Sequence, residues 1–196
     1  MRAYFILLTA IGLTACTAPA QEPIDVYDDM LAQSTYFSQN NTTGQRPSIF
    51  ERFTQSSKNP TSLAVSFLNF GEQTHRQELK EFTGVDPVRT EWCAAFVNAV
   101  LRESGIPGSE SVSRHPLLAR SFLKWGESVD EPKSGDLVVF PRGNASWQGH
   151  VGFYMGSVNV GGVQYYRILG GNQNNEVSIE LYPANRAIDI RRESPI

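Results

Sequence analysis

The chain has 196 residues, of which 40% are hydrophobic and 11% aromatic, and its net charge is −3 at pH 7. This size and composition predict one globular domain with a single hydrophobic core. With this slightly acidic balance, no basic patch of the kind that binds nucleic acid stands out in the sequence. The sequence has no internal repeat and no Cys/His cluster with metal-ligand spacing, so we expect neither a repeat architecture nor a metal site.

Residues 1–16 are typical of an export signal. Arg2 supplies an early positive charge, and residues 4–13 form an apolar stretch that is too short to span a bilayer. The stretch ends in Leu13-Thr14-Ala15-Cys16, which resembles a bacterial lipobox, in which the cysteine is lipidated and becomes the new N-terminus. The alternative is cleavage after Ala18-Pro19-Ala20, which would release a secreted protein.

Both alternatives place the mature chain outside the cytoplasm. If Cys16 carries a lipid, Thr17 follows it, and the lack of aspartate there resembles lipoproteins of the outer membrane. We therefore expect lipidation at Cys16 and a position facing the periplasm if the host is Gram-negative. Residues 17–60 are polar and rich in turn formers, which indicates a leader or tether. We expect residues 61–196 to form the folded domain.

Helical patterns come first in this domain. Apolar spacing predicts helices over residues 63–70, 75–82 and 117–125, each followed closely by a glycine. A fourth helix is expected to run to about residue 104, with Thr90 as its N-cap and Cys93 near its third position. Free backbone N–H groups and the helix dipole stabilise an anion there, so the pattern predicts a thiol that ionises readily.

Strand patterns follow the helices. The connections between them are short or rich in Gly and Asn, which favours an antiparallel meander. Helices followed by strands predict an α+β fold in which the Cys93 helix packs on one face of the sheet. The expected strands are residues 137–140, 149–156, 163–169, 177–181 and 187–190.

Cys93 is the strongest candidate for a reactive group. The chain has two cysteines, and Cys16 is either lipidated or removed, so Cys93 has no partner for an internal disulfide. A single thiol in an oxidising compartment is a liability unless the protein uses it. The alternative is a small buried side chain in an Ala-rich helix, which is an ordinary place for cysteine. The lack of a partner favours the nucleophile.

A cysteine nucleophile needs a base within hydrogen-bond reach, and His150 is the best candidate among three histidines. It opens a strand between Gly149 and Gly152, which let another group approach closely. His75 lies in a polar stretch and His115 in a loop. The alternative is a histidine packed at the edge of the sheet.

The base in turn needs a group that fixes its tautomer. Asn172 ends the following strand and is placed to accept a hydrogen bond from the imidazole N–H. Glu176 and Asp136 are weaker candidates. A turn residue beside Gly171 is the alternative interpretation of Asn172.

These motifs together resemble the CHAP and NlpC cell-wall peptidases, which are papain-like cysteine enzymes of bacteria and phages. The resemblance covers about residues 61–192 and implies a papain-like CHAP/NlpC fold with N-terminal helices on a C-terminal antiparallel sheet. It implies Cys93 as nucleophile, His150 as general base and Asn172 as the orienting residue, with no cofactor. The segments that carry it are Trp92–Asn98, Ser146–Gly152 and Gly170–Gln173.

The implied activity is a peptidoglycan hydrolase that cuts amide bonds of the wall peptide, as an endopeptidase or an amidase. Trp92 and Trp147 flank the catalytic residues and are expected to line the cleft, with core packing as the alternative. Arg89 and Arg142 are candidates for contacts with substrate carboxylates. We expect a monomer. A non-catalytic peptidoglycan-binding envelope lipoprotein and a thiol acyltransferase remain alternatives.

Overall fold

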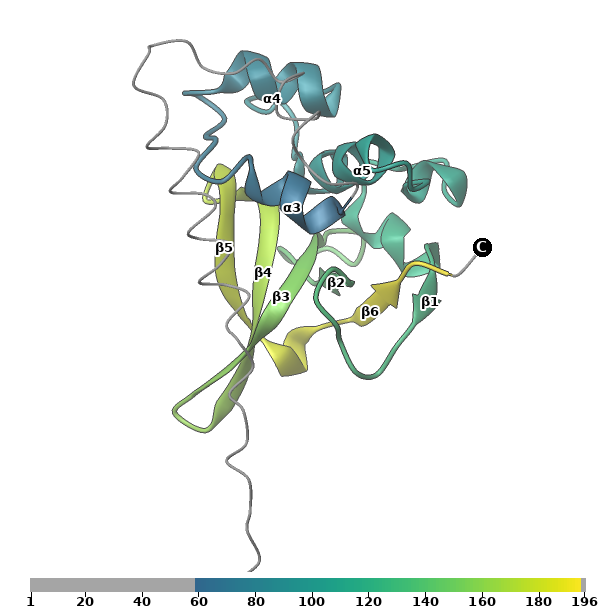
Figure 1. The fold of residues 1–196 in the computed structure, drawn as a ribbon, viewed down its shortest axis with the longest axis vertical. Helices are drawn as coiled ribbons and strands as arrows, with labels where there is room; N and C mark the ends of the chain where they lie inside the picture. Colours follow the sequence, from purple (N-terminus) through teal and green to yellow (C-terminus); the bar gives the residue numbers. More distant parts are fainter. Residues whose placement is uncertain (1–58, 195–196) are drawn as a thin grey trace, which may run out of the picture.

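The computed structural model describes residues 59–194, in which helices pack on one face of a six-stranded antiparallel sheet (Figure 1). The α+β class and the antiparallel sheet expected from the sequence are therefore confirmed. The predicted export signal, the lipidation site Cys16 and most of the leader lie outside the described residues. Within residues 59–194, no helix is both long enough and apolar enough to cross a membrane.

Two of the predicted helices match the structure closely, and two do not. The helix expected over 63–70 begins earlier, because the Asn59 side chain accepts a hydrogen bond from the Thr61 N–H at 2.9 Å, and it ends at Val65. The helix expected over 117–125 is a shorter 3₁₀ helix. The helices are α3 (Pro60–Val65), α4 (Arg76–Thr83), α5 (Cys93–Glu103), η1 (Ser109–Ser111), η2 (Ala119–Lys124) and η3 (Ala184–Arg186).

The sheet has the order β1-β6-β2-β3-β4-β5. Strands β2 to β5 form the expected meander, but β6 returns to pair with β2, so the whole sheet is not one meander. The buried Asp136 accepts two hydrogen bonds from Arg192, from Nε at 2.9 Å and from Nη2 at 2.7 Å, which anchors β6 at this place. The strands are β1 (Glu127–Ser128), β2 (Leu137–Phe140), β3 (His150–Val160), β4 (Val163–Gln173), β5 (Glu176–Pro183) and β6 (Asp189–Arg192).

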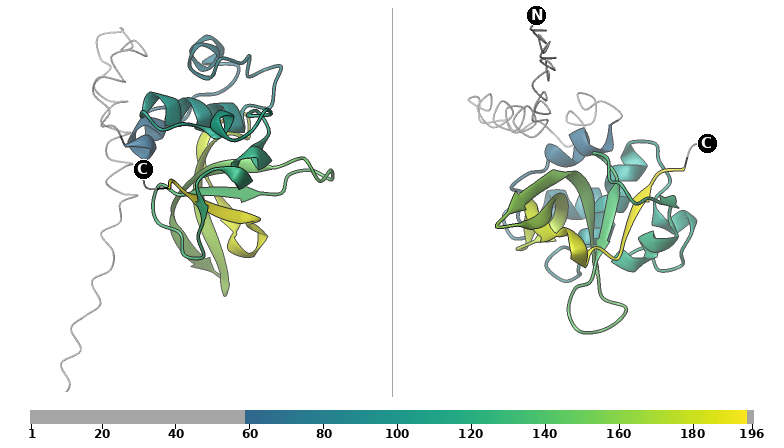
Figure 2. Two further views of the ribbon diagram at one scale, coloured as in Figure 1. Left: turned by 90° about the vertical axis from the view of Figure 1, so that its right-hand side faces the viewer. Right: turned by 90° about the horizontal axis from the view of Figure 1, so that it is seen from below.

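Helix α5 packs on β3 and β4, and every residue from Cys93 to Leu101 is buried. Side chains of β2 alternate between two clusters: Leu137 and Val139 join the core beneath the helices, whereas Val138 and Phe140 join a smaller cluster on the opposite face. Two further views show α3, α4 and α5 gathered on one side of the sheet (Figure 2), whereas η3 packs against the smaller cluster on the opposite face. With both faces covered, the first half of β3, beginning at His150, is fully buried.

Candidate active site

Cys93 is the first residue of α5, not the third, because the N-cap residue is Trp92 rather than the predicted Thr90. The Trp92 ring is fully buried, packs edge-on against Phe96, and lies so close to Gly171 that any side chain there would collide with it. The prediction that Trp92 lines the substrate cleft is therefore wrong. Trp92 instead fixes the start of α5 against β4, which sets the position of Cys93.

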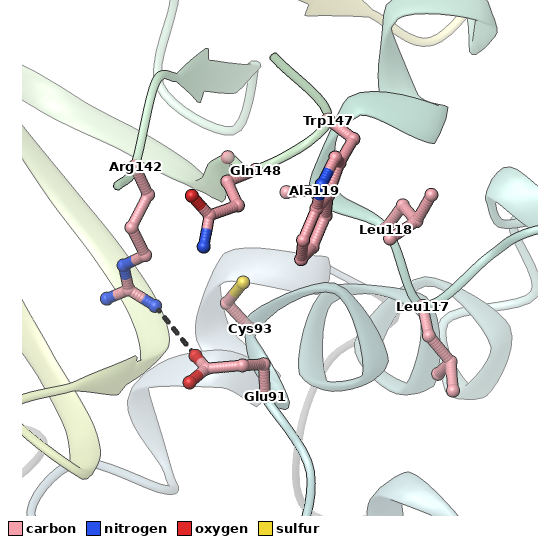
Figure 3. Close-up of a pocket in the computed structure, with 9 residues that line it drawn as sticks. Glu91, Cys93, Leu117, Leu118, Ala119, Arg142, Trp147 and Gln148 are labelled. Carbon is pink, nitrogen blue, oxygen red and sulfur yellow. Dashed lines mark hydrogen bonds and ion pairs between the residues drawn. The ribbon is translucent and has the colours of Figure 1, made fainter. Parts of the chain in front are cut away.

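The Cys93 side chain reaches a pocket of about 230 Å³. Figure 3 shows its sulfur pointing into the pocket, with Arg142 and Glu91 on one side and Trp147 on the other. Trp147 is 60% exposed, so the expectation that it lines the cleft agrees with its position. The lining residues are Glu91, Cys93, Leu117, Leu118, Ala119, Arg142, Trp147, Gln148 and Gly149.

The environment of Cys93 favours the neutral thiol in the free protein. Burial raises the pKa of this thiol, and the charge of Arg142 and hydrogen bonds from the backbone N–H groups of Val151 and Ala94 offset only part of that increase. Glu91 raises the pKa further. The expectation of a readily ionised thiol is thus wrong for the free protein. It considered the stabilisation of a thiolate by the helix N-terminus but not the increase in pKa that burial causes.

The hydrogen bonds of Gln173 determine the tautomer of His150. Gln173 Nε2 donates to the carbonyl oxygens of Ser178 at 2.7 Å and Ile168 at 3.2 Å, so its Oε1 faces the imidazole. This oxygen can only accept, and it lies 3.0 Å from His150 Nε2, which therefore carries the proton. His150 Nδ1 is then a bare lone pair, and it is buried without a hydrogen-bond partner among residues 59–194.

The hydrogen bond expected between Asn172 and the imidazole is not the one that forms. Asn172 Nδ2 donates to Glu91 Oε2 at 2.7 Å instead. A β-bulge between Gly170 and Gln173 inserts one extra residue into β4, and Asn172 takes a left-handed conformation with φ 58°. The extra residue turns Asn172 away and brings Gln173 to His150, which corrects the predicted orienting residue.

His150 and Cys93 share three neighbours, so the structure brings the predicted nucleophile and base into one site. The N–H of Val151, the residue after His150, donates a hydrogen bond to the Cys93 sulfur. The Tyr182 ring stacks on the imidazole with 5.3 Å between the ring centroids, and charge on Cys93 raises the pKa of Tyr182. The positive charge of Arg142 lowers the pKa values of Cys93, His150 and Tyr182. Burial, and secondarily Arg142, lowers the pKa of His150 to about 3, so the ring is neutral at physiological pH.

Several residues of this site were not assigned from the sequence, among them Gln173, Tyr182 and Glu91. Gln173 belongs to the Gly170–Gln173 motif. The sequence analysis did not predict the bulge that places Gln173, rather than Asn172, at the imidazole. Tyr182 comes from β5, beyond the predicted motifs. Arg89, expected near substrate, instead contacts Asp86 at 3.7 Å, whereas Arg142 lies in the pocket.

Cys93 is buried at a helix start, and the Nδ1 lone pair of His150 has no hydrogen-bond partner among residues 59–194. A cysteine nucleophile needs a base of this kind in the same site. Among residues 59–194 no group of three or more His, Cys, Asp or Glu side chains is arranged to hold a metal ion.

The family model of the CHAP domain matches residues 85–172, which confirms the resemblance seen in the sequence over this part of the chain. The match includes Cys93 and His150 and ends one residue before Gln173. CHAP domains are typically hydrolases that act on peptidoglycan, which indicates peptidoglycan hydrolase activity in general. No curated protein matches the chain.

Proposed function

We propose that this protein hydrolyses amide bonds of the peptidoglycan peptide by a cysteine peptidase or amidase mechanism, with Cys93 as nucleophile and His150 as general base. The observation that carries the proposal is the imidazole tautomer. Gln173 holds the proton on Nε2, and the unpartnered Nδ1 lone pair is buried in the site that holds the Cys93 thiol.

The reaction begins with a neutral pair. His150 Nδ1 takes the proton of the Cys93 thiol as the sulfur attacks the amide carbonyl carbon, so a C–S bond forms and the carbonyl oxygen becomes an oxyanion. The Cys93 backbone N–H, at the first position of α5, is a donor for this oxyanion. The imidazolium then protonates the leaving nitrogen, and the C–N bond breaks to leave a thioester.

Water completes the cycle. His150 Nδ1 removes a proton from a water molecule that attacks the thioester carbonyl, and the C–S bond breaks to release the carboxylic acid. The proton returns to the sulfur, which restores the neutral thiol and imidazole. In this proposal Gln173 takes the orienting role first expected of Asn172, which gives a papain-like cysteine–histidine–amide set.

The two sides of the pocket suit different parts of a wall peptide. The exposed Trp147 indole and Leu117 offer an apolar surface on one side of the sulfur. Arg142, whose Nη2 donates to the Asn172 carbonyl oxygen at 2.7 Å, offers a positive charge on the other. We infer that a substrate carboxylate contacts Arg142 in place of Glu91, whose 3.4 Å ion pair is highly exposed and therefore weak.

We also infer that a lipid at Cys16 anchors the enzyme in the cell envelope, where its substrate is. This rests on the export signal and the lipobox-like Leu13–Cys16 alone. Metabolic labelling with a fatty acid tests it: the full-length protein should incorporate label and Cys16→Ser should not. Label in Cys16→Ser, or none in either protein, would contradict the anchor.

Digestion of purified sacculi tests the activity. The protein should release fragments whose masses identify the cleaved amide bond, and Cys93→Ala should release none. The same fragments from Cys93→Ala would contradict the cysteine mechanism. Intact sacculi with both proteins would favour the non-catalytic peptidoglycan-binding alternative. Fragments joined to an added amine would indicate a transferase.

A further inference from the structure

Gln148 lies in the pocket two residues before His150, and its side-chain amide is held in one orientation. Gln148 Oε1 accepts a hydrogen bond from the Ala145 N–H at 2.9 Å, so the oxygen end is occupied. The backbone of the same residue is held at both ends, because its N–H donates to Ala145 O at 3.0 Å and its carbonyl accepts from Arg120 Nε at 2.8 Å.

The loop that contains Gln148 is built around this amide. Gly143 has a left-handed φ of 65°, and a Cβ added there would collide with the Gln148 carboxamide. Glycine at this position avoids both the backbone strain and the collision. The loop therefore holds the carboxamide in a fixed place before any substrate arrives, which is the requirement for electrostatic catalysis by a preorganised dipole.

The nitrogen end of the amide points at the reacting centre. Gln148 Nε2 makes no hydrogen bond within residues 59–194, and Figure 3 shows it directed toward the Cys93 sulfur. An amide N–H₂ is a donor only. A donor aimed at the space beside the nucleophile meets the oxygen on which negative charge develops when the sulfur attacks a carbonyl.

We propose that Gln148 is a catalytic residue that donates a hydrogen bond from Nε2 to the oxyanion of the tetrahedral intermediate. Together with the Cys93 backbone N–H it completes a two-donor oxyanion hole. This inference rests on the thiol chemistry of the proposed function but not on the identity of the substrate, because any acyl donor passes through the same intermediate.

The test compares Gln148→Ala and Gln148→Glu with Ser146→Ala, an exposed position of the same loop. An activated ester that acylates the thiol reports the step without a wall substrate. We expect the acylation rate of Gln148→Ala to fall about 100-fold, as for loss of one oxyanion donor. Gln148→Glu retains an acceptor for the Ala145 N–H but repels the oxyanion, so it should fall at least as far.

A second readout separates catalysis from support of the loop. A peptide aldehyde adds to the Cys93 sulfur as a hemithioacetal, which mimics the intermediate, whereas its alcohol analogue mimics only the ground state. Loss of Gln148 should weaken the binding of the aldehyde by about the same factor as it lowers the acylation rate. The affinity for the alcohol should not change.

The inference would be overturned if the aldehyde and the alcohol lost affinity equally. It would also be overturned if Gln148→Ala and Gln148→Glu kept the wild-type acylation rate. Sacculi left intact by a wild-type protein whose acylation depends on Gln148 would instead overturn the proposed substrate and support this role.

Discussion

Replacement of Gln173 by alanine tests the orientation of the catalytic imidazole most directly. The change removes the acceptor 3.0 Å from His150 Nε2 and leaves a buried N–H without a partner, which costs about 1–3 kcal/mol. The ring can avoid that cost by moving its proton to Nδ1, but this eliminates the lone pair that the thiol needs. Either outcome raises the barrier, and we expect kcat/KM to fall about 10- to 100-fold.

The matched control is Asn172→Gly. It removes the other amide of the motif, keeps the carbonyl that holds Arg142, and suits the left-handed backbone at φ 58°. Activity should therefore decrease much less than in Gln173→Ala. Turnover of isolated wall fragments measures both variants under the same conditions.

Nitrogen NMR of the imidazole adds a readout that a purely structural role would not change. The wild-type ring of His150, assigned with His150→Gln, should carry its proton on Nε2, and Gln173→Ala should lose that preference. A proton on Nδ1 in the wild-type protein would refute the reasoning. So would an Asn172→Gly variant that loses activity while Gln173→Ala retains it.

Three further predictions follow from the same site. Because burial lowers the pKa of His150 from 6.5 to about 3, the unfolded chain binds one more proton between these values. Urea unfolding should therefore show stability decreasing as the pH falls through this range, by about 1.4 kcal/mol per pH unit more than in His150→Gln; equal slopes would contradict the buried neutral ring. Arg142→Gln should move the pH dependence of Cys93 alkylation to higher pH, since the guanidinium lowers the pKa of that thiol; an unchanged profile would show that the charge does not reach the sulfur. Trp147→Ala should raise KM several-fold without changing the melting temperature, because the indole is 60% exposed and lines the pocket; a lower melting temperature would indicate core packing instead.

The comparison of Asn172 with Gln173 shows where sequence reasoning failed. Phe153 pairs with Leu169, and extending that register three residues along each strand would set His150 opposite Asn172. The regular pairing thus predicts Asn172 at the imidazole. The bulge in β4 adds one residue before the contact, and the strand face reverses with every residue. The residue pattern of this segment did not predict that bulge.

The predictions that Trp92 lines the cleft and that the Cys93 thiol ionises readily failed for a related reason. Both predictions depended on how much of a side chain is exposed, which is set by elements distant in sequence. Gly171 of β4 covers the Trp92 ring, and the sheet buries the sulfur that the helix terminus would otherwise help to ionise. Local sequence placed Trp92 and Cys93 at the helix start correctly to within a few positions. It could not show that burial raises the pKa of the thiol by more than the helix terminus lowers it.

The sequence by itself determined the α+β class, the helix that carries Cys93 and the strand that His150 opens. These depend on local periodicity and on glycine positions, both of which act over short distances along the chain. Tertiary structure alone decided which amide faces the imidazole, which aromatic ring covers it and which charges act on the thiol. Those contacts join α5 to β3, β4 and β5 and depend on strand register and burial, which follow from the packing of the whole domain.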